Sequence, residues 1–77
     1  MTLAQAAMVA GSRRRLREGE AEAIRVQAGL SQGDIARALG VTAGAVSRRE
    51  AGTRVPRGAL AVRYARLLEL LERERDQ

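Results

Sequence analysis

The hydrophobic pattern of residues 29–52 predicts two short amphipathic helices joined by a tight turn. The apolar positions recur at the spacing of one helix face, with Ile35, Ala36 and Leu39 in the first helix and Ala45 and Val46 in the second. Because helices this short bury little apolar surface by themselves, we expect the rest of the chain to pack around them.

Capping residues mark the ends of both helices. Ser31 is suited to cap the first helix, and Asp34 completes a capping-box pattern that places a carboxylate at the positive end of the helix. Gly40 is expected to end this helix, since glycine adopts a positive φ without strain. Thr42 caps the second helix, which we expect to be closed by Gly52.

The start of the chain predicts a short helix. Residues 1–11 contain good helix formers and a capping-box spacing between Thr2 and Gln5. Gly11 is expected to end that helix. A disordered tail is the alternative for this segment.

A further helix is predicted over residues 16–28. Gly19 lowers the stability of its middle by about 1 kcal/mol relative to alanine, so a kink or a late start near this position is the alternative to one continuous helix. In the continuous helix, the residues that face the core are Leu16, Ala23, Ile24 and either Gln27 or Ala28.

The end of the chain predicts a loop followed by a long helix. Pro56 pushes Val55 away from helical angles, which places residues 53–58 in a loop. In the helix over residues 58–75, an apolar stripe with four-and-three spacing consists of Leu60, Tyr64, Leu67, Leu68 and Leu71. Leu70 lies off that stripe, and we expect it to be exposed and available for a homodimer contact through this helix.

Composition restricts the chemistry that the chain can perform. Seventy-seven residues make one small domain, which buries roughly 60% of the surface of the unfolded chain. We assign residues 13–77 to this domain and residues 1–12 to an N-terminal extension. The chain has no cysteine and no histidine, so it lacks a thiolate nucleophile, the usual general base and the commonest metal ligands. We therefore expect no enzyme activity, no metal site, no cofactor and no small-molecule substrate.

The charge balance indicates a polyanionic partner. The net charge is +5 and all fourteen basic residues are arginine, whose planar fork matches phosphate groups and guanine edges. A GC-rich genome is an alternative reason for the use of arginine, but it leaves the excess of positive charge unexplained. Tyr64 is the only aromatic residue, whereas proteins that bind single strands or RNA stack bases on several rings. Double-stranded DNA is therefore the better candidate.

A membrane location is not indicated. No apolar run approaches the roughly 20 residues that span a bilayer, and no signal-peptide pattern is present. The prediction is a soluble protein of the cytoplasm with no membrane partner.

Several motifs between residues 24 and 68 are shared with one family of DNA-binding proteins. They are Arg25, Gly29-Leu30-Ser31-Gln32, Asp34-Ile35-Ala36, Leu39-Gly40-Val41-Thr42, Val46-Ser47-Arg48, Glu50-Ala51-Gly52 and Pro56. In these residues the chain resembles the Cro/phage-repressor (XRE-like) helix-turn-helix family. The resemblance implies an all-α fold, a compact lambda-repressor-like bundle of four or five helices. It also implies binding of operator DNA, commonly as a homodimer, to control transcription.

The resemblance and the helix pattern together assign roles to individual residues. The outward positions of the helix over residues 42–50, which are the candidates for reading bases, are Ala43, Gly44, Ser47 and Arg48. Arg48 is the best candidate for a guanine contact. The residues expected to contact phosphates are Gln32, Thr42, Arg49, Arg54 and Arg57. Arg25 and Glu50 are expected to form a structural ion pair.

Two features depart from the family pattern. Ala43 and Gly44 stand where repressors of this family often carry longer polar residues, which indicates a close approach of the helix and a sparse base code. Arg49 replaces the aromatic or aliphatic residue that usually precedes the glutamate. Its side chain must either lie over the core or reach a phosphate, and we favour the phosphate.

Two questions stay open at the level of sequence. Residues 12–15, Ser-Arg-Arg-Arg, fit either an arm along DNA or a solvated helix start. The fold also occurs in antitoxins, so an antitoxin-like or other protein-interaction module is the alternative to a phage or bacterial repressor. In that alternative, the N-terminal segment and the last helix would grip a toxin or another regulator.

Overall fold

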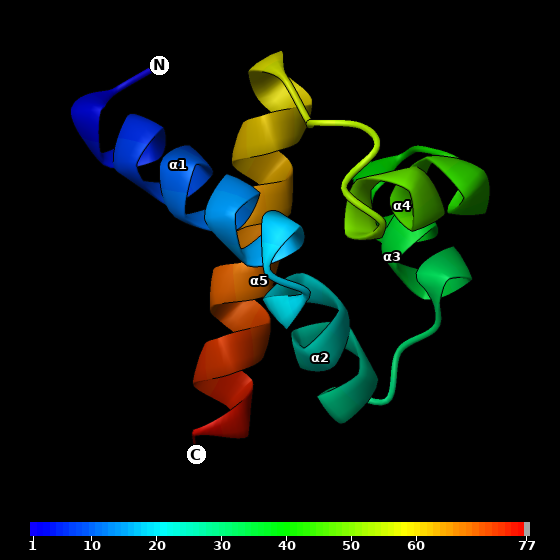
Figure 1. Ribbon diagram of the computed structural model, residues 1–77. Coiled ribbons are helices and arrows are strands. Elements are labelled where there is room, and N and C mark those ends of the chain that lie inside the picture. Colours follow the sequence, from blue (N-terminus) through cyan, green and yellow to red (C-terminus); the bar gives the residue numbers. More distant parts are fainter. Residues whose placement is uncertain (77) are drawn as a thin grey trace.

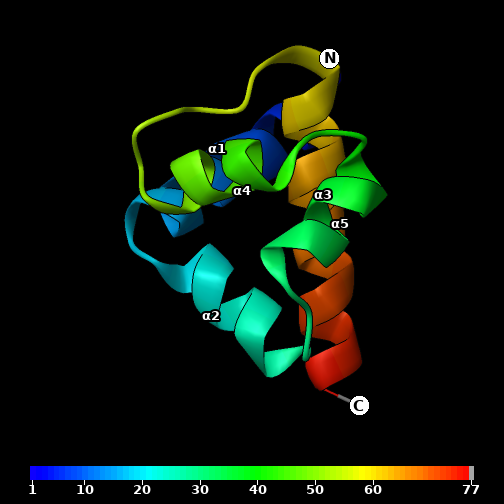
Figure 2. The same ribbon diagram turned by 90° about the vertical axis from the view of Figure 1, so that its right-hand side faces the viewer.

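The computed structural model describes residues 1–76, which form five helices and contain no strand in that range (Figure 1). The helices are α1 (Leu3–Arg17), α2 (Glu20–Gln27), α3 (Gln32–Leu39), α4 (Ala43–Glu50) and α5 (Gly58–Arg75). Helix α5 runs most of the length of the molecule, α1 crosses it, and α3 and α4 lie together to one side (Figures 1 and 2). The predicted all-α bundle is confirmed.

The predicted caps of α3 and α4 are present. The Ser31 hydroxyl accepts a hydrogen bond from the Asp34 N–H at 3.0 Å, and the Asp34 carboxylate accepts one from the Ser31 N–H at 2.8 Å. The hydrogen bond from the Ser31 N–H to the carboxylate is the main reason why the pKa of Asp34 lies below its usual value. Gly40 has a φ of 74°, which turns the chain out of α3. The Thr42 hydroxyl accepts from the Ala45 N–H at 3.1 Å and starts α4.

One apolar core contains side chains from each of the helices α1 to α5. Its buried members are Leu16, Ala21, Ile24, Ile35, Ala36, Leu39, Val46, Tyr64 and Leu68. The inward positions predicted for α3 are therefore confirmed, and in α4 Val46 is fully buried while Ala45 is half-buried. Since α3 and α4 bury one side each, their other sides are left for solvent or a partner.

The first helix runs past the glycine that we expected to end it. α1 continues through Gly11 to Arg17, so the prediction of a stop at Gly11 is wrong. The reason is packing, because Val9 is buried against Ala61 and Ala65 of α5 on one side of that glycine. This burial outweighs the helix cost of about 1 kcal/mol that a glycine carries. α1 also crosses the boundary drawn after residue 12, and the division into extension and domain stays a prediction.

The basic cluster of residues 12–15 is neither an arm nor a helix start. It lies inside α1, where the Ser12 hydroxyl is buried and donates to the Val9 carbonyl at 3.0 Å. Arg15 forms an ion pair with Glu72 of α5. The positive charges therefore fall near the C-terminal end of a helix, where the macrodipole favours them.

The chain breaks at Gly19, as the alternative prediction allowed. Gly19 has a φ of 79°, and α2 begins at the next residue. Because the break changes the helical phase, Ala21 is buried and Ala23 is exposed, so the inward position predicted for Ala23 is wrong. The predicted inward positions at Gln27 and Ala28 are also wrong, since both are exposed. The burial predicted for Leu16 and Ile24 is confirmed.

The stripe predicted for α5 faces the core. Tyr64 and Leu68 are buried, and the half-buried members are Leu60, Leu67 and Leu71. Leu70 is 44% exposed, as its place off the stripe predicted. Within the described part of the chain, no helix combines the length and the apolar character that crossing a bilayer requires.

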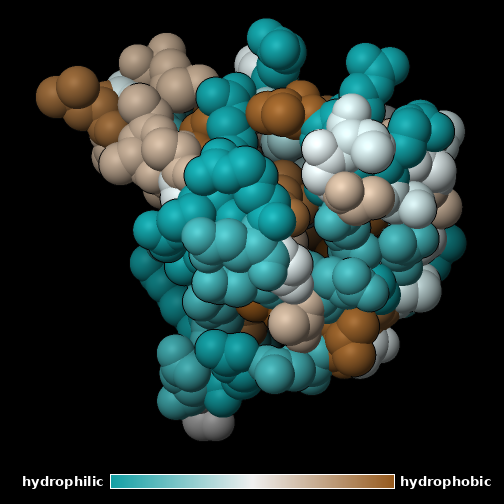
Figure 3. Space-filling model, viewed as in Figure 1, coloured by the Kyte–Doolittle hydropathy of each residue, from teal (hydrophilic) through white to brown (hydrophobic). Residues whose placement is uncertain are grey.

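Apolar side chains gather on the outside of the molecule at the free end of α1 (Figure 3). Leu3 is 92% exposed and Met1 is 71% exposed. Ala4, Ala6 and Ala7 are exposed as well. The first turns of α1 thus extend beyond the part of the helix that packs on α5 (Figure 1).

Candidate nucleic-acid interface

One side of α4 is exposed. All four residues predicted to read bases are exposed on it, namely Ala43, Gly44, Ser47 and Arg48. Val46 on the opposite side is fully buried, which fixes the rotation of the helix about its axis. The exposed side is mostly small, so the backbone of α4 can come close to a partner surface.

The guanidinium of Arg48 lies over Gly44. A Cβ atom built on Gly44 would be 3.3 Å from Nη1 of Arg48, closer than an ordinary van der Waals contact. The Arg48 side chain therefore runs back along α4 toward its N-terminus and fills the space that a side chain at position 44 would take. This arrangement places a planar, five-donor group over the middle of the exposed side.

Arg25 and Glu50 form the expected ion pair. Nε of Arg25 lies 2.7 Å from Oε2 of Glu50 and Nη2 lies 3.1 Å from Oε1, a bidentate contact. The two side chains are only 11% and 4% exposed. The hydrogen bond to Glu50 raises the pKa of Arg25 above its already high ordinary value. Nη1 of Arg25 also donates to the Leu30 carbonyl at 2.9 Å, so this arginine ties the end of α4 to α2 and to the start of α3.

The five residues predicted to contact phosphates fall into two groups. Thr42, Arg54 and Arg57 are exposed, whereas Gln32 and Arg49 are half-buried. Gln32 donates through Nε2 to Oε1 of Glu50 at 3.0 Å, and the second hydrogen of that amide is left for another acceptor. Arg49 folds back along its own helix, with Nη1 donating to the Ala45 carbonyl at 3.0 Å.

Arginines without a carboxylate partner surround the exposed side of α4. Among the described residues, the ion pairs involve Arg15, Arg25, Arg37, Arg66, Arg73 and Arg75, and none involves Arg48, Arg49, Arg54 or Arg57. Glu50 is the only acidic residue between Asp34 and Glu69, and Arg25 and Gln32 hold both of its oxygens. The positive charge on this face is therefore not neutralised by the protein.

A helix-turn-helix family model matches residues 22–74 of the chain. This span includes α3, the turn at Gly40, α4 and most of α5. The chain belongs to the XRE-type helix-turn-helix family. It is a DNA-binding regulator of that type, and its DNA-binding motif is the pair α3–α4. The comparisons with curated proteins and with solved structures give no match.

The loop after α4 of this XRE-type protein is held at both ends. The N–H and the hydroxyl of Thr53 both donate to the Arg48 carbonyl at 3.0 Å, which closes α4. Pro56 is buried, and its carbonyl accepts two hydrogen bonds from Arg13, through Nε at 3.3 Å and Nη2 at 3.0 Å. The sequence carries no local signal for this contact, because its two ends are 43 residues apart.

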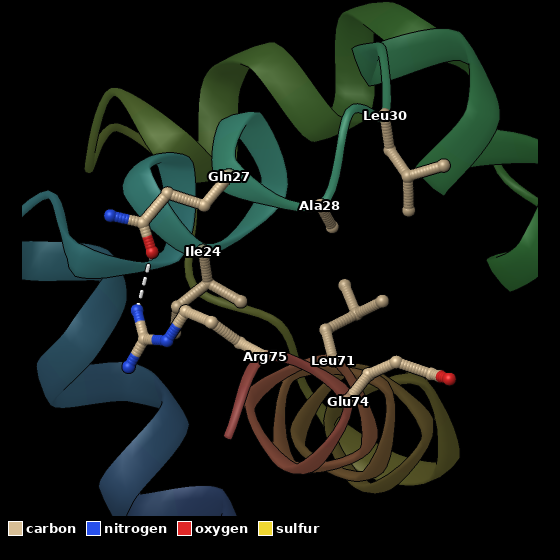
Figure 4. Close-up of a pocket in the computed structure, with 7 residues that line it drawn as sticks. All are labelled: Ile24, Gln27, Ala28, Leu30, Leu71, Glu74 and Arg75. Atoms are coloured by element: carbon tan, nitrogen blue, oxygen red, sulfur yellow. Dashed lines mark hydrogen bonds between the residues drawn. The ribbon is translucent and has the colours of Figure 1, made fainter. Parts of the chain in front are cut away.

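A hollow between α2 and α5 lies at the other end of the molecule (Figure 4). Its volume is about 400 Å³, and Ile24, Leu30 and Leu71 supply its apolar walls. Gln27 and Arg75 close one edge by a hydrogen bond. Within residues 1–76, no group of three acidic side chains lies close enough together to hold a metal ion.

Proposed function

We propose that this XRE-type regulator is a sequence-specific repressor or Cro-type protein that reads the major groove of double-stranded operator DNA with α4. It acts by binding and not by catalysis, in the cytoplasm of a bacterium or of a phage-infected host. The observation that carries the proposal is the exposed, small side of α4 with Arg48 over its middle and unpaired arginines at its edges. Such a surface offers shape and charge to a groove at the same time.

Base contacts in this proposal are few. Arg48 donates two hydrogen bonds to one guanine, a contact that contributes about 1–3 kcal/mol of discrimination against the wrong base. Ser47 serves either a donor or an acceptor on a neighbouring base edge. Ala43 contributes an apolar contact with a thymine methyl group, and Gly44 contributes none.

Phosphate contacts orient α4 in the groove. Thr42 and the first turn of α3, with the free amide hydrogen of Gln32, present donors on the helix-turn-helix itself. Arg49, Arg54 and Arg57 present cations on the end of α4 and on its loop. Since each neutralised phosphate releases counterions, the affinity falls steeply as salt is raised.

Leu70 supports a homodimer in this proposal. It lies at the edge of an apolar hollow of about 290 Å³ between α3 and α5, whose walls include Ala38, Val62 and Leu67. A two-fold dimer through this face would present two copies of α4 to half-sites about 10 base pairs apart.

Selection from random duplexes followed by sequencing tests the proposal. We expect enriched sites with two-fold symmetry and at least one strongly preferred guanine in each half-site. Arg48→Ala is expected to relax the preference at that base pair by about 1–3 kcal/mol, whereas Arg54→Ala is expected to weaken all duplexes to a similar extent. Failure of the wild-type protein to enrich any duplex, or an unchanged preference in Arg48→Ala, would contradict the proposal.

The exposed apolar end of α1 favours a second candidate function, an antitoxin-like module that binds another protein. Leu3 and Met1 are almost fully exposed and lie outside the matched family span. In this candidate, α1 and α5 grip the partner while α4 stays free for DNA. Co-purification with a stoichiometric partner that is lost in Leu3→Ser, together with weak duplex binding by the chain alone, supports this candidate over the first.

A further inference from the structure

A hollow lined by arginines lies between α1 and the loop that follows α4. Four arginines line it: Arg13 and Arg17 from α1, Arg49 from α4, and Arg54 from the loop. Its volume is about 60 Å³, and Leu16 and Pro56 form its floor. Two of these arginines come from a helix that lies outside the matched family span of residues 22–74.

No carboxylate neutralises this hollow. None of its four arginines takes part in an ion pair among the described residues, and no acidic residue lines it. Four guanidinium groups around one hollow repel each other, so the arrangement favours an anion at their centre. The positive charge of this hollow is therefore not compensated by a carboxylate of the described residues.

Two of the four guanidinium groups are already held in place. Arg13 is fixed by its two hydrogen bonds to the Pro56 carbonyl, and Arg49 by its bond to the Ala45 carbonyl. Nε of Arg49 is buried and has no hydrogen-bond partner among residues 1–76. A buried donor without a partner costs about 1–3 kcal/mol, and an acceptor in the hollow would recover that cost. Arg17 and Arg54 are exposed at the rim, where they can close over the acceptor.

We propose that this hollow binds one phosphate of the DNA backbone, so that α1 adds a clamp to the contacts made by α3, α4 and the loop. The proposal rests on the proposed function, because it assumes that α4 lies in the major groove. The hollow is lined by Gly52, Arg54 and Val55 of the loop that follows α4, and the proposed function places this loop at the sugar-phosphate strand beside the groove. Planar arginine forks match the oxygens of a phosphate and carry no sequence information, so this clamp adds affinity to all duplexes alike.

Ethylation interference on a selected duplex tests the clamp. The wild-type protein, Arg17→Ala and Arg73→Ala are compared, and the last variant is the control because it removes an exposed arginine from the far end of α5. We expect Arg17→Ala to lose interference at one phosphate per bound protein, while base preference stays the same. The slope of log affinity against log salt is expected to fall by about 0.9 in Arg17→Ala and to stay unchanged in Arg73→Ala.

The outcomes separate this proposal from the proposed function. An absence of duplex binding by the wild-type protein overturns both proposals. Duplex binding with the same interference pattern and salt slope in Arg17→Ala overturns only the clamp. If inorganic phosphate raises the melting temperature of the wild-type protein but not of Arg17→Ala, and the interference pattern is unchanged, the hollow belongs to a free anion and the clamp is wrong. Arg17 is exposed at the last turn of α1, so its replacement is expected to leave the fold intact, which circular dichroism verifies.

Discussion

The second half of α5 and the end of α4 with its loop both carry several arginines, but they differ in what those arginines bind. In α5, Glu69 pairs with Arg66 and with Arg73. At the end of α4, Arg48 and the loop residues Arg54 and Arg57 form no ion pair with a carboxylate of the described residues. The comparison shows that Arg48, Arg49, Arg54 and Arg57 form no ion pair among the described residues. The α5 arginines Arg66, Arg73 and Arg75 each lie within ion-pair distance of a carboxylate, which reduces their attraction for a polyanion.

Arg25 is an intermediate case between these two groups of arginines. It resembles the α5 arginines in having a carboxylate partner, but its partner is Glu50, the last residue of α4. By binding Glu50, the only acidic residue between Asp34 and Glu69, Arg25 compensates the negative charge at the end of α4. Its role is therefore structural, whereas Arg48, Arg54 and Arg57 take part in no ion pair among the described residues.

The largest expected effect comes from removing the carboxylate that Arg25 binds. Glu50→Gln leaves the 11%-exposed Arg25 side chain with only the exposed carboxylate of Glu22, 4.0 Å from Nη2, as a counter-charge, and we expect a loss of about 3–5 kcal/mol in the free energy of unfolding. Urea unfolding measures this loss. Glu69→Gln is the matched control on α5, where exposed ion pairs contribute about 1 kcal/mol or less. Equal losses in the two variants would remove the distinction between buried and surface pairs.

A smaller loss in the free energy of unfolding is expected at alkaline pH. Burial, and then the charge of Glu50, raise the pKa of Tyr64 from 10 to about 12. Between these two values the unfolded chain loses the phenolic proton and the folded chain keeps it, so the free energy of unfolding falls as the pH rises. A shift of two units corresponds to about 3 kcal/mol of stability, present below pH 10 and lost by pH 12.

This pH dependence separates the contribution of Tyr64 from that of the ion pairs, because the arginines stay charged between pH 10 and pH 12 and keep their carboxylate partners. Tyr64 is the only aromatic residue, so tyrosinate absorbance reports its titration directly. Tyr64→Phe is the control and is expected to lose most of the slope of stability between pH 10 and pH 12. A tyrosinate midpoint near 10 in the folded protein would contradict the expected burial effect.

The α3–α4 unit was predictable from sequence because its determinants are local. Ser31, Asp34, Gly40 and Thr42 act on backbone groups within four residues of themselves, so a capping rule finds them without knowledge of the rest of the fold. The exposed side of α4 then follows from Val46, which sets the helical phase. The confirmed part of the prediction is therefore the part that neighbouring residues determine.

The course of the N-terminal region depends on contacts between distant residues and was not predictable in the same way. Gly11 has the composition of a helix stop, but the burial of Val9 against α5 carries the helix through it. In the sequence, Arg13 fits either an arm along DNA or a solvated helix start, yet in the fold it donates a hydrogen bond to the Pro56 carbonyl. The arginine-lined hollow between α1 and the loop depends on both contacts, so no local pattern indicates it.

The smallest expected effect separates stability from recognition on α4 itself. Gly44→Ala replaces an exposed helical glycine, so we expect the free energy of unfolding to rise by about 0.5–1 kcal/mol. The new Cβ would lie 3.3 Å from Nη1 of Arg48 and would push that guanidinium by a few tenths of an ångström. We therefore expect a weaker preference at the base pair that Arg48 reads, measured by competition between duplexes that differ only there. Gly33→Ala is the control in α3, because its Cβ would meet Nη1 of Arg37 at an ordinary 3.6 Å. That variant is expected to gain similar stability with no change in base preference, and the same change in both variants would mean that the position of Arg48 over Gly44 does not set specificity.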